Sequence, residues 1–383
     1  MKRIPYGRHS ITPQDLEAVN EALMSDFITQ GSHSVEFEKV FAQYVGSKYA
    51  VSVSNGTAGL HIAAKVLGVQ PGDKVITTPL TFVASANCVR FCGGDVHFSD
   101  IDRKTLLMDP AQLESLLDSH PKNTFKGIIP VDFAGFPLNM EKFREIANKH
   151  NLWILEDACH APGAAFIDSK GIRQRTGNCE FSDMSVFSFH PVKHITTGEG
   201  GMVTTNDEKL YKKLILYRSH GITRDESLLK ENHGGWYYEM QTLSHNYRIT
   251  DFQCALGLSQ LKRADKGLER RREIADRYDV AFSNSPVKTP FRAKGTEHAL
   301  HLYVVEVPDR LNFYNYLVKN NIFAQIHYIP VHYMPYYRNL GWKKGDFPLT
   351  EDYYEHCISL PIFPILTDEE QEYVIEKVLA YYK

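Results

Sequence analysis

Residues 188–201 read Ser188-Phe189-His190-Pro191-Val192-Lys193-His194-Ile195-Thr196-Thr197-Gly198-Glu199-Gly200-Gly201. A single lysine, Lys193, stands here among small and hydroxylic residues, and a glycine-rich run follows it. Glycines let the backbone pass close to a bound group. A lysine in a tight, partly desolvated site loses its proton readily and becomes a nucleophile toward an aldehyde. The stretch therefore predicts a loop that presents a reactive amine.

A carboxylate lies upstream, at the end of an apolar segment. Residues 153–157 read Trp-Ile-Leu-Glu-Asp and predict a strand that ends at Asp157. Ligands bind at the carboxyl ends of strands in open α/β sheets. A lysine that bonds to an aldehyde and an aspartate that pairs with a pyridinium nitrogen are what pyridoxal phosphate demands of a protein. Lys193 and Asp157 together predict a pyridoxal phosphate enzyme, although Asp157 alone is also consistent with a helix cap or an exposed strand-end acid.

Three further segments are candidates for cofactor contacts. Residues Gly56-Thr57-Ala58 open a predicted helix directly after a predicted strand, and the first amides of such a helix bind anions. Ser188 is a second candidate ligand for the same phosphate. Phe82 is expected to start the helix after the next strand, where its ring either stacks on the cofactor or belongs to the core. His160 either supports the site or packs behind it.

Strand and helix patterns alternate over the first half of the chain. The segments expected as strands are 49–54, 74–78, 95–99, 127–131, 153–157, 184–189 and 202–205, and those expected as helices are 58–67, 82–92, 110–117, 140–150 and 207–219. Short apolar strands that alternate with helices predict a mostly parallel sheet covered on both faces. A long helical stretch is expected over 250–282. A smaller α+β unit follows, with strands at 301–307 and 323–328 and helices at 311–320 and 367–382.

Composition limits the class of protein. The chain has 383 residues, 43% of them hydrophobic, and a net charge of −3, so we expect two domains (1–265 and 266–383) and no nucleic acid partner. None of the six cysteines forms a Cys-x-x-Cys pair, which disfavours metal binding and favours a reducing compartment. The amino-terminal residues lack a signal-peptide pattern, and no apolar run is long enough for a membrane span. We therefore expect a cytoplasmic protein without a metal.

Taken together, these motifs resemble those of the DegT/DnrJ/EryC1/StrS family of sugar aminotransferases. The resemblance covers nearly the whole chain and is strongest in Leu23 to Gly31 (ending Phe27-Ile28-Thr29-Gln30-Gly31), Ser54-Asn55-Gly56-Thr57-Ala58, Glu156-Asp157-Ala158 and residues 188–201. Two further segments, His245-Asn246-Tyr247-Arg248 and Ile326-His327-Tyr328-Ile329-Pro330, add to it. It implies the pyridoxal phosphate fold of aspartate aminotransferase (fold type I), which is α/β, with a large domain and a smaller carboxyl-terminal α+β domain. His194 departs from the family, because close relatives often have proline after the lysine.

The resemblance also implies roles for individual residues. Lys193 is expected to be the catalytic residue that bonds to the cofactor. The implied cofactor site consists of Gly56, Thr57, Ala58, Phe82, Asp157, His160, Ser188, Lys193 and Asn246. The implied substrate site consists of Tyr6, Asp26, Phe27, Ile28, Thr29, Gly56, Ser188, Asn246, Ile326, His327, Tyr328 and Ile329. Because Asn246 is expected to reach the cofactor phosphate of the neighbouring subunit, the resemblance implies a homodimer with shared active sites.

The implied reaction moves an amino group from L-glutamate to C4 of a UDP-linked 4-keto-6-deoxy-N-acetyl-hexosamine. Its products are UDP-4-amino-4,6-dideoxy-N-acetyl-β-L-altrosamine, on the route to pseudaminic acid, and 2-oxoglutarate. Some family members have histidine in place of the lysine and act as dehydratases, so Lys193 implies amino transfer. Amination at another position, or of another nucleotide-linked keto-sugar or a cyclitol, remains an alternative. So does a pyridoxal phosphate-binding protein without catalysis. A nicotinamide dehydrogenase is disfavoured because no Gly-x-Gly-x-x-Gly follows the first strand.

Overall fold

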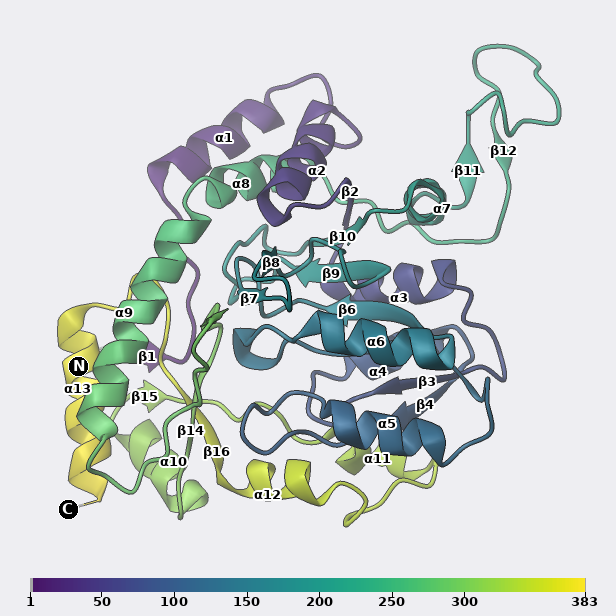
Figure 1. Ribbon diagram of the computed structural model, residues 1–383. Coiled ribbons are helices and arrows are strands. Elements are labelled where there is room, and N and C mark those ends of the chain that lie inside the picture. Colours follow the sequence, from purple (N-terminus) through teal and green to yellow (C-terminus); the bar gives the residue numbers. More distant parts are fainter. Residues whose placement is uncertain (1–2, 383) are drawn as a thin grey trace.

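A seven-stranded sheet forms the centre of the molecule in the computed structural model, which describes residues 3–382 (Figure 1). Its strands, in spatial order, are β2 (Tyr49–Val53), β10 (Gly201–Thr205), β9 (Met184–Ser188), β6 (Trp153–Asp157), β5 (Phe125–Ile129), β3 (Lys74–Thr77) and β4 (Asp95–Phe98). Strand β10 runs antiparallel to both neighbours, and the pairs from β9 to β4 are parallel. The expected mostly parallel α/β sheet is confirmed.

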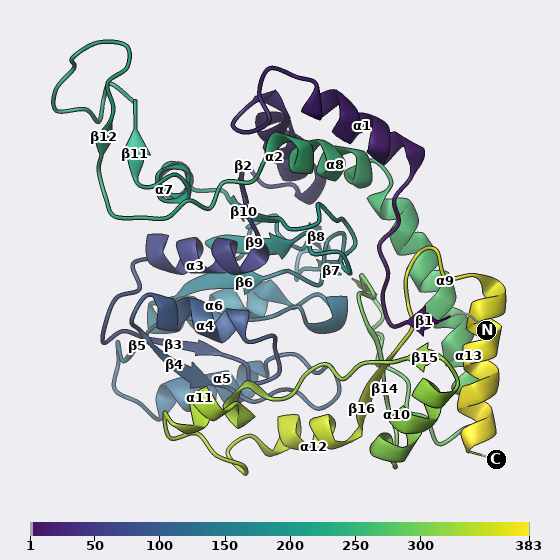
Figure 2. The same ribbon diagram turned by 180° about the vertical axis from the view of Figure 1, so that it is seen from behind.

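Helices cover both faces of this sheet. Helices α5 (Pro110–Asp118) and α6 (Met140–His150) lie on the face that is in front in Figure 1, and α3 (Gly56–Val66) and α4 (Ala84–Phe91) lie on the face that is in front in Figure 2. Successive strand residues point to opposite faces. Ile154 of β6 accordingly joins the core beneath α5 and α6, whereas Leu155 joins the core beneath α3. A strand of a sheet that is buried on both faces therefore needs apolar residues at successive positions, without alternation between apolar and polar residues.

Peripheral elements extend from this body. Helices α1 (Pro13–Leu23) and α2 (Ser32–Val45) pack with α8 (Asp251–Leu261), and a small sheet joins β7 (Ala165–Ile167), β8 (Arg173–Arg175) and β13 (Thr296–Glu297). After α7 (Glu208–Arg218), strands β11 (Ile222–Thr223) and β12 (Glu239–Met240) form a hairpin that projects away from the body in both views. We call residues 222–240 the arm. Trp236 of the arm is 74% exposed.

The helical stretch expected over 250–282 is not continuous. It consists of α8 and α9 (Ala264–Phe282), and Arg263 between them has φ −120° and ψ 11°, outside the helical range. The prediction of one helix was wrong because a distant contact decides this point: the Arg263 guanidinium forms an ion pair with the buried carboxylate of Asp15 on α1. We propose that the two domains divide at 265/266, in the first turn of α9 and close to this break.

The carboxyl-terminal part has its own core. This core joins α9 to β14 (Tyr303–Glu306), α10 (Arg310–Lys319), β15 (Ile322–Phe323), β16 (Cys357–Leu360) and α13 (Asp368–Tyr381). The segment between β15 and β16 contains the 3-10 turn η2 (Val331–Tyr333), α11 (Pro335–Arg338) and α12 (Pro348–His356), and its buried side chains pack into the cores of the large unit. A second 3-10 turn, η1 (Phe133–Gly135), follows β5 in the large unit. Strand β14 pairs with β16, and β15 pairs with β1 (Ile4–Pro5) from the start of the chain. The strand expected over 323–328 is therefore wrong beyond Phe323: residues 324–328 pass as irregular chain toward the central sheet.

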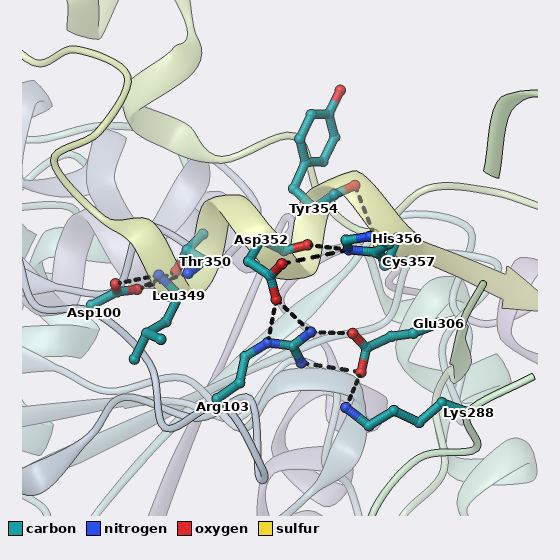
Figure 3. Close-up of polar contacts among 10 residues, drawn as sticks. All are labelled: Asp100, Arg103, Lys288, Glu306, Leu349, Thr350, Asp352, Tyr354, His356 and Cys357. Atoms are coloured by element: carbon teal, nitrogen blue, oxygen red, sulfur yellow. Dashed lines mark hydrogen bonds and ion pairs between the residues drawn. The ribbon is translucent and has the colours of Figure 1, made fainter. Parts of the chain in front are cut away.

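Polar side chains connect the carboxyl-terminal part to the large unit (Figure 3). The Arg103 guanidinium contacts the carboxylates of Glu306 and Asp352. The buried carboxylate of Asp100 accepts hydrogen bonds from the backbone amides of Leu349 and Thr350 at 3.0 Å each. Among residues 3–382, none of the helices combines the length and the apolar character that a membrane span requires.

Candidate active site

The candidate site lies where the central strands end. Strand β2 leads into the start of α3, β6 ends at Asp157, and its neighbour β9 ends at Ser188. Parallel strands place their carboxyl ends at one edge of the sheet. A cavity of about 750 Å³ opens there. Among the residues expected in the site, those that line it are Tyr6, Gly56, Thr57, Ala58, Phe82, Asp157, His160, Ser188, Lys193, His327 and Tyr328.

Lys193 projects from a tight turn after β9. Its amide donates to the carbonyl of His190 at 2.8 Å, and its Nζ lies 3.4 Å from Nε2 of His301. The surrounding protein displaces water from the ammonium group and lowers the pKa of Lys193 to about 8, although the nearby Cys159 and Asp157 act in the opposite direction. An amine with that pKa is partly neutral near physiological pH, as a nucleophile or proton carrier must be.

Asp157 is held by two donors at the end of β6. Ser85 Oγ donates to Oδ2 at 2.6 Å, and the backbone amide of Cys159 donates to Oδ1 at 3.2 Å. The side chain is 5% exposed and lines the cavity. An exposed strand-end acid is therefore excluded. The two hydrogen bonds fix the orientation of a carboxylate that faces the same cavity as Lys193.

The start of α3, at which the sequence patterns predict an anion seat, presents free backbone amides. Asn55 caps the helix by accepting from the Ala58 amide at 2.8 Å. The Gly56 and Thr57 amides, at the first two helical positions, have no acceptor within residues 3–382. A Cβ added at Gly56 would lie 3.0 Å from Cβ of Ser188 and 3.3 Å from Sγ of Cys159. Free amides at a helix start, a lysine and a fixed carboxylate around one cavity fit pyridoxal phosphate.

Two aromatic side chains cover another wall of the cavity. Phe82 does not start the helix as expected, because α4 begins two residues later at Ala84. Its side chain is 54% exposed and its ring centroid lies 6.1 Å from that of Tyr328. The core interpretation of Phe82 is therefore wrong: the ring lines the cavity.

His160 is buried, and both of its ring nitrogens have hydrogen-bond partners. Its Nδ1 accepts from the Ala134 amide at 3.3 Å, and its Nε2 lies 3.0 Å from the Tyr328 hydroxyl. Burial and the positive charge of Lys193 lower the pKa of His160 well below its ordinary value. The imidazole is therefore neutral and connects the strand-end loop to the segment that carries Tyr328.

Several expected site residues lie outside this cavity in a single chain: Asp26, Phe27, Ile28, Thr29, Asn246, Ile326 and Ile329. Phe27 and Ile28 are 65% and 50% exposed, and Asn246 is also exposed. Their roles stay predictions. Conversely, Cys159 and His301 line the cavity, and the buried Ser85 donates to Asp157, although the sequence patterns did not point to these three residues. Ser85 lies one turn beyond Phe82, which is the only local signal that could have indicated it.

A lysine, a carboxylate and a helix start around one cavity define the class of pyridoxal phosphate-dependent transferases. The chain belongs to the DegT/DnrJ/EryC1/StrS aminotransferase family, whose model matches residues 9–379. Aminotransferases of this family depend on pyridoxal phosphate. The sequence prediction of family, fold type and cofactor is therefore confirmed.

Curated relatives match nearly the full length of the chain. The spore coat polysaccharide biosynthesis protein SpsC of Bacillus subtilis is 38% identical, over 98% of this chain and 96% of that protein. GDP-perosamine synthase of Escherichia coli O157:H7 is 35% identical, over 100% and 99%. The UDP-4-amino-4,6-dideoxy-N-acetyl-beta-L-altrosamine transaminase of Campylobacter jejuni is 34% identical, over 98% and 97%.

Solved structures agree with this assignment. The putative sugar aminotransferase Spr1654 of Streptococcus pneumoniae, in its PMP form, has a TM-score of 0.90 and 31% identity, covering 98% of both chains. PseC of Helicobacter pylori, an aminotransferase of pseudaminic acid biosynthesis, has a TM-score of 0.89 and 32% identity, covering 100% of this chain and 99% of that one. The chain is thus similar to sugar aminotransferases with different printed products.

Proposed function

We propose that this protein transfers the amino group of L-glutamate to C4 of a UDP-linked 4-keto-6-deoxy-N-acetyl-hexosamine. The products would be UDP-4-amino-4,6-dideoxy-N-acetyl-β-L-altrosamine, for pseudaminic acid biosynthesis, and 2-oxoglutarate. The observation that carries the proposal is the amine of Lys193 and the carboxylate of Asp157 facing one cavity. Similarity to the Campylobacter transaminase and to Helicobacter PseC supports the choice of sugar.

Named residues account for cofactor binding. Gly56, Thr57 and Ser188 would hold the phosphate, Asp157 the ring nitrogen and Phe82 the ring face. Ser85 keeps the Asp157 carboxylate oriented through its 2.6 Å hydrogen bond. When bound, pyridoxal phosphate supplies an aldehyde that captures the amino group and a ring that accepts electrons.

Lys193 carries the proton steps. Once its amine is free, Nζ takes the proton from the α carbon of L-glutamate, and in the second half of the reaction it gives a proton to C4 of the sugar. A pKa of about 8 lets one group both accept and donate a proton near neutral pH. The cavity, of about 750 Å³, lies within the range of small-molecule sites in proteins.

A second candidate function is amination of a GDP-linked keto-sugar. GDP-perosamine synthase is 35% identical to this chain, about as similar as the altrosamine transaminase. The residues around Lys193 act on the sugar carbon and not on the base, so they do not discriminate between the two nucleotides.

Product analysis tests the proposal. The protein, loaded with pyridoxal phosphate, is incubated with nitrogen-15 L-glutamate and the UDP-linked 4-keto sugar, with Lys193→Ala as the blank. We expect NMR to place the labelled nitrogen on C4, and Lys193→Ala to give no product. A nitrogen on another carbon, or a higher kcat/KM with a GDP-linked keto-sugar, would replace the proposed substrate. Full activity of Lys193→Ala would overturn the catalytic assignment.

We further propose a cytoplasmic homodimer in which Asn246 and residues 26–29 complete the site of the partner subunit. The exposure of Phe27, Ile28 and Asn246 supports this arrangement. The arm, which projects from the body (Figure 1), also supports it, because its Trp236 is exposed in a single chain. The six cysteines are all unpaired, which supports a reducing compartment.

A further inference from the structure

His301 occupies a fixed position at the back of the cavity. It precedes β14, and the side chain of the buried Arg271 on α9 donates to the carbonyls of Leu300 at 3.1 Å and of His301 at 3.3 Å. On the other side, the amide of Leu302 donates to the carbonyl of Ala134 at 3.2 Å. The backbone of His301 is therefore held from two directions, by α9 and by the loop after β5.

The imidazole of His301 faces Lys193. Its Nε2 lies 3.4 Å from Nζ of Lys193, and its buried Nδ1 has no hydrogen-bond partner among residues 3–382. The side chain is 4% exposed. Burial, together with the positive charges of Lys193 and Arg271, holds the pKa of His301 well below its ordinary value. In a neutral imidazole one nitrogen carries the proton and the other can accept a hydrogen bond. Nε2 of His301 can therefore accept a hydrogen bond from the amine of Lys193.

The other histidines near Lys193 have their nitrogens directed elsewhere. Both nitrogens of His160 are engaged, as described above. His194 Nε2 lies 2.8 Å from the carbonyl of Ala299, and its ring borders a separate cavity beside α9. His327 Nδ1 lies 2.8 Å from the Ser359 hydroxyl. His301 is thus the imidazole in the described structure that bonds to the lysine.

We propose that His301 is a positioning residue that holds the released amine of Lys193 through Nε2 and stabilises its ammonium form. The reason is a difference in hydrogen-bond strength, because a bond from a charged donor is stronger than one from a neutral amine. Desolvation makes Lys193 a weaker base, and His301 offsets part of that effect. The inference rests on the proposed role of Lys193, but it concerns the proton affinity of the amine and not the identity of the sugar.

Other groups around Lys193 act by charge alone. Asp157 and Cys159 favour its charged form, whereas desolvation opposes it. The titratable and charged groups around this region are Tyr6, Asp157, Cys159, His160, His190, His194, Glu199, Tyr247, Arg271, His301, His327 and Tyr328. The His301 ring also packs on that of His160, with ring centroids 4.4 Å apart. Every substitution at His301 removes this ring contact, so the difference between two substitutions, and not either shift alone, reports on the hydrogen bond to Lys193.

Two substitutions of His301 separate hydrogen bonding from packing. In His301→Gln the amide group reaches the position of Nε2, and in His301→Asn it reaches only the position of Nδ1. The apoprotein is labelled with acetic anhydride at a series of pH values, and the modification of Lys193 is measured by mass spectrometry. We expect the midpoint for His301→Asn to move to lower pH by about one pH unit, a tenfold loss of proton affinity. His301→Gln should keep the midpoint of the wild type, and so should the control His194→Gln.

An equal midpoint in all proteins, or an equal shift in His301→Asn and His301→Gln, would overturn the proposal. A measurement on the wild-type apoprotein does not depend on whether the variants fold. The wild-type apoprotein is labelled with nitrogen-15 histidine and its imidazole resonances are recorded by NMR as a function of pH. We expect the Nε2 resonance of one imidazole to change at the pH at which Lys193 titrates in the acetylation experiment. If no imidazole resonance changes in that pH range, the proposal is also overturned. None of these experiments uses substrate, so their results do not depend on whether the proposed sugar is correct.

Discussion

At the scale of single residues, Lys193 shows how burial prepares a side chain for chemistry. An exposed lysine has a pKa near 10.5, whereas Lys193 has a pKa of about 8 in the folded chain. The unfolded chain therefore binds more protons than the folded chain between pH 8 and pH 10.5. Below this window the amine is charged in both states and the full penalty for burying the charge is present. Above it the amine is neutral in both states and the penalty disappears.

Lys193→Met removes the charge with little change of shape. At pH 7 we expect the variant apoprotein to be more stable than the wild type by about 1–2 kcal/mol, a value reduced from the full pKa difference because the amine still reaches the cavity. This advantage should shrink as the pH rises from 8 to 10.5. Urea unfolding of both apoproteins across that range measures it. An advantage that stays constant with pH would mean that the amine is not desolvated.

Residue patterns predicted Lys193, Asp157 and the Gly56 turn because each carries a local signal: a glycine-rich loop, an apolar strand that ends in an acid, and a strand followed by Gly-Thr. They did not predict Ser85 or His301. Ser85 meets Asp157 across 72 positions and His301 meets Lys193 across 108. A side chain that acts across such a distance leaves no spacing pattern in the sequence.

At the scale of elements, α12 depends on a residue far away in the chain. The residue before the helix, Phe347, supplies no side-chain cap. Asp100 takes its place: its carboxylate accepts from the amides of Leu349 and Thr350, and from the Thr350 hydroxyl at 2.6 Å (Figure 3). The first amides of a helix have no acceptor within the helix itself. One buried carboxylate therefore fixes α12 to the large unit.

We expect Asp100→Ala to lower the free energy of unfolding by about 2–3 kcal/mol, because buried amides lose their acceptor. Asp352→Ala, at an exposed partner of Arg103 in the same region, should change it by less than about 1 kcal/mol. Urea denaturation of the two variants provides the comparison. Equal effects would show that α12 is held by its apolar contacts and not by the cap.

The sequence predicts some boundaries of helices and strands correctly and misses others. Helix α6 and strand β6 were predicted with their observed bounds, because apolar periodicity and turn residues mark them locally. The break between α8 and α9 and the early end of β15 were not predicted. The Arg263–Asp15 ion pair decides the first, and pairing with a two-residue strand at the start of the chain limits the second.

At the scale of the whole molecule, the proposed dimer makes a specific prediction about mixed subunits. If Asn246 serves the partner's cofactor, a hybrid of Lys193→Ala and Asn246→Ala chains contains one site with both native residues. After the two variants are unfolded and refolded together, we expect activity several-fold above that of the variants refolded separately and then mixed. No gain, despite hybrid formation shown by native mass spectrometry, would place Asn246 in the site of its own chain.

The sequence by itself determined the family, the α/β sheet, the cofactor class and the lysine that lines the cavity, because these depend on local runs of residues that bring their own strand, turn or glycine loop. The tertiary structure decided which side chains surround that lysine, where the long helix breaks and how the carboxyl-terminal part is anchored. Those features arise from contacts between segments that are far apart in the chain, such as His301 and Lys193, Arg263 and Asp15, and Asp100 and Thr350. Only the packing of the complete chain brings such segments together, so no periodicity in the sequence records them.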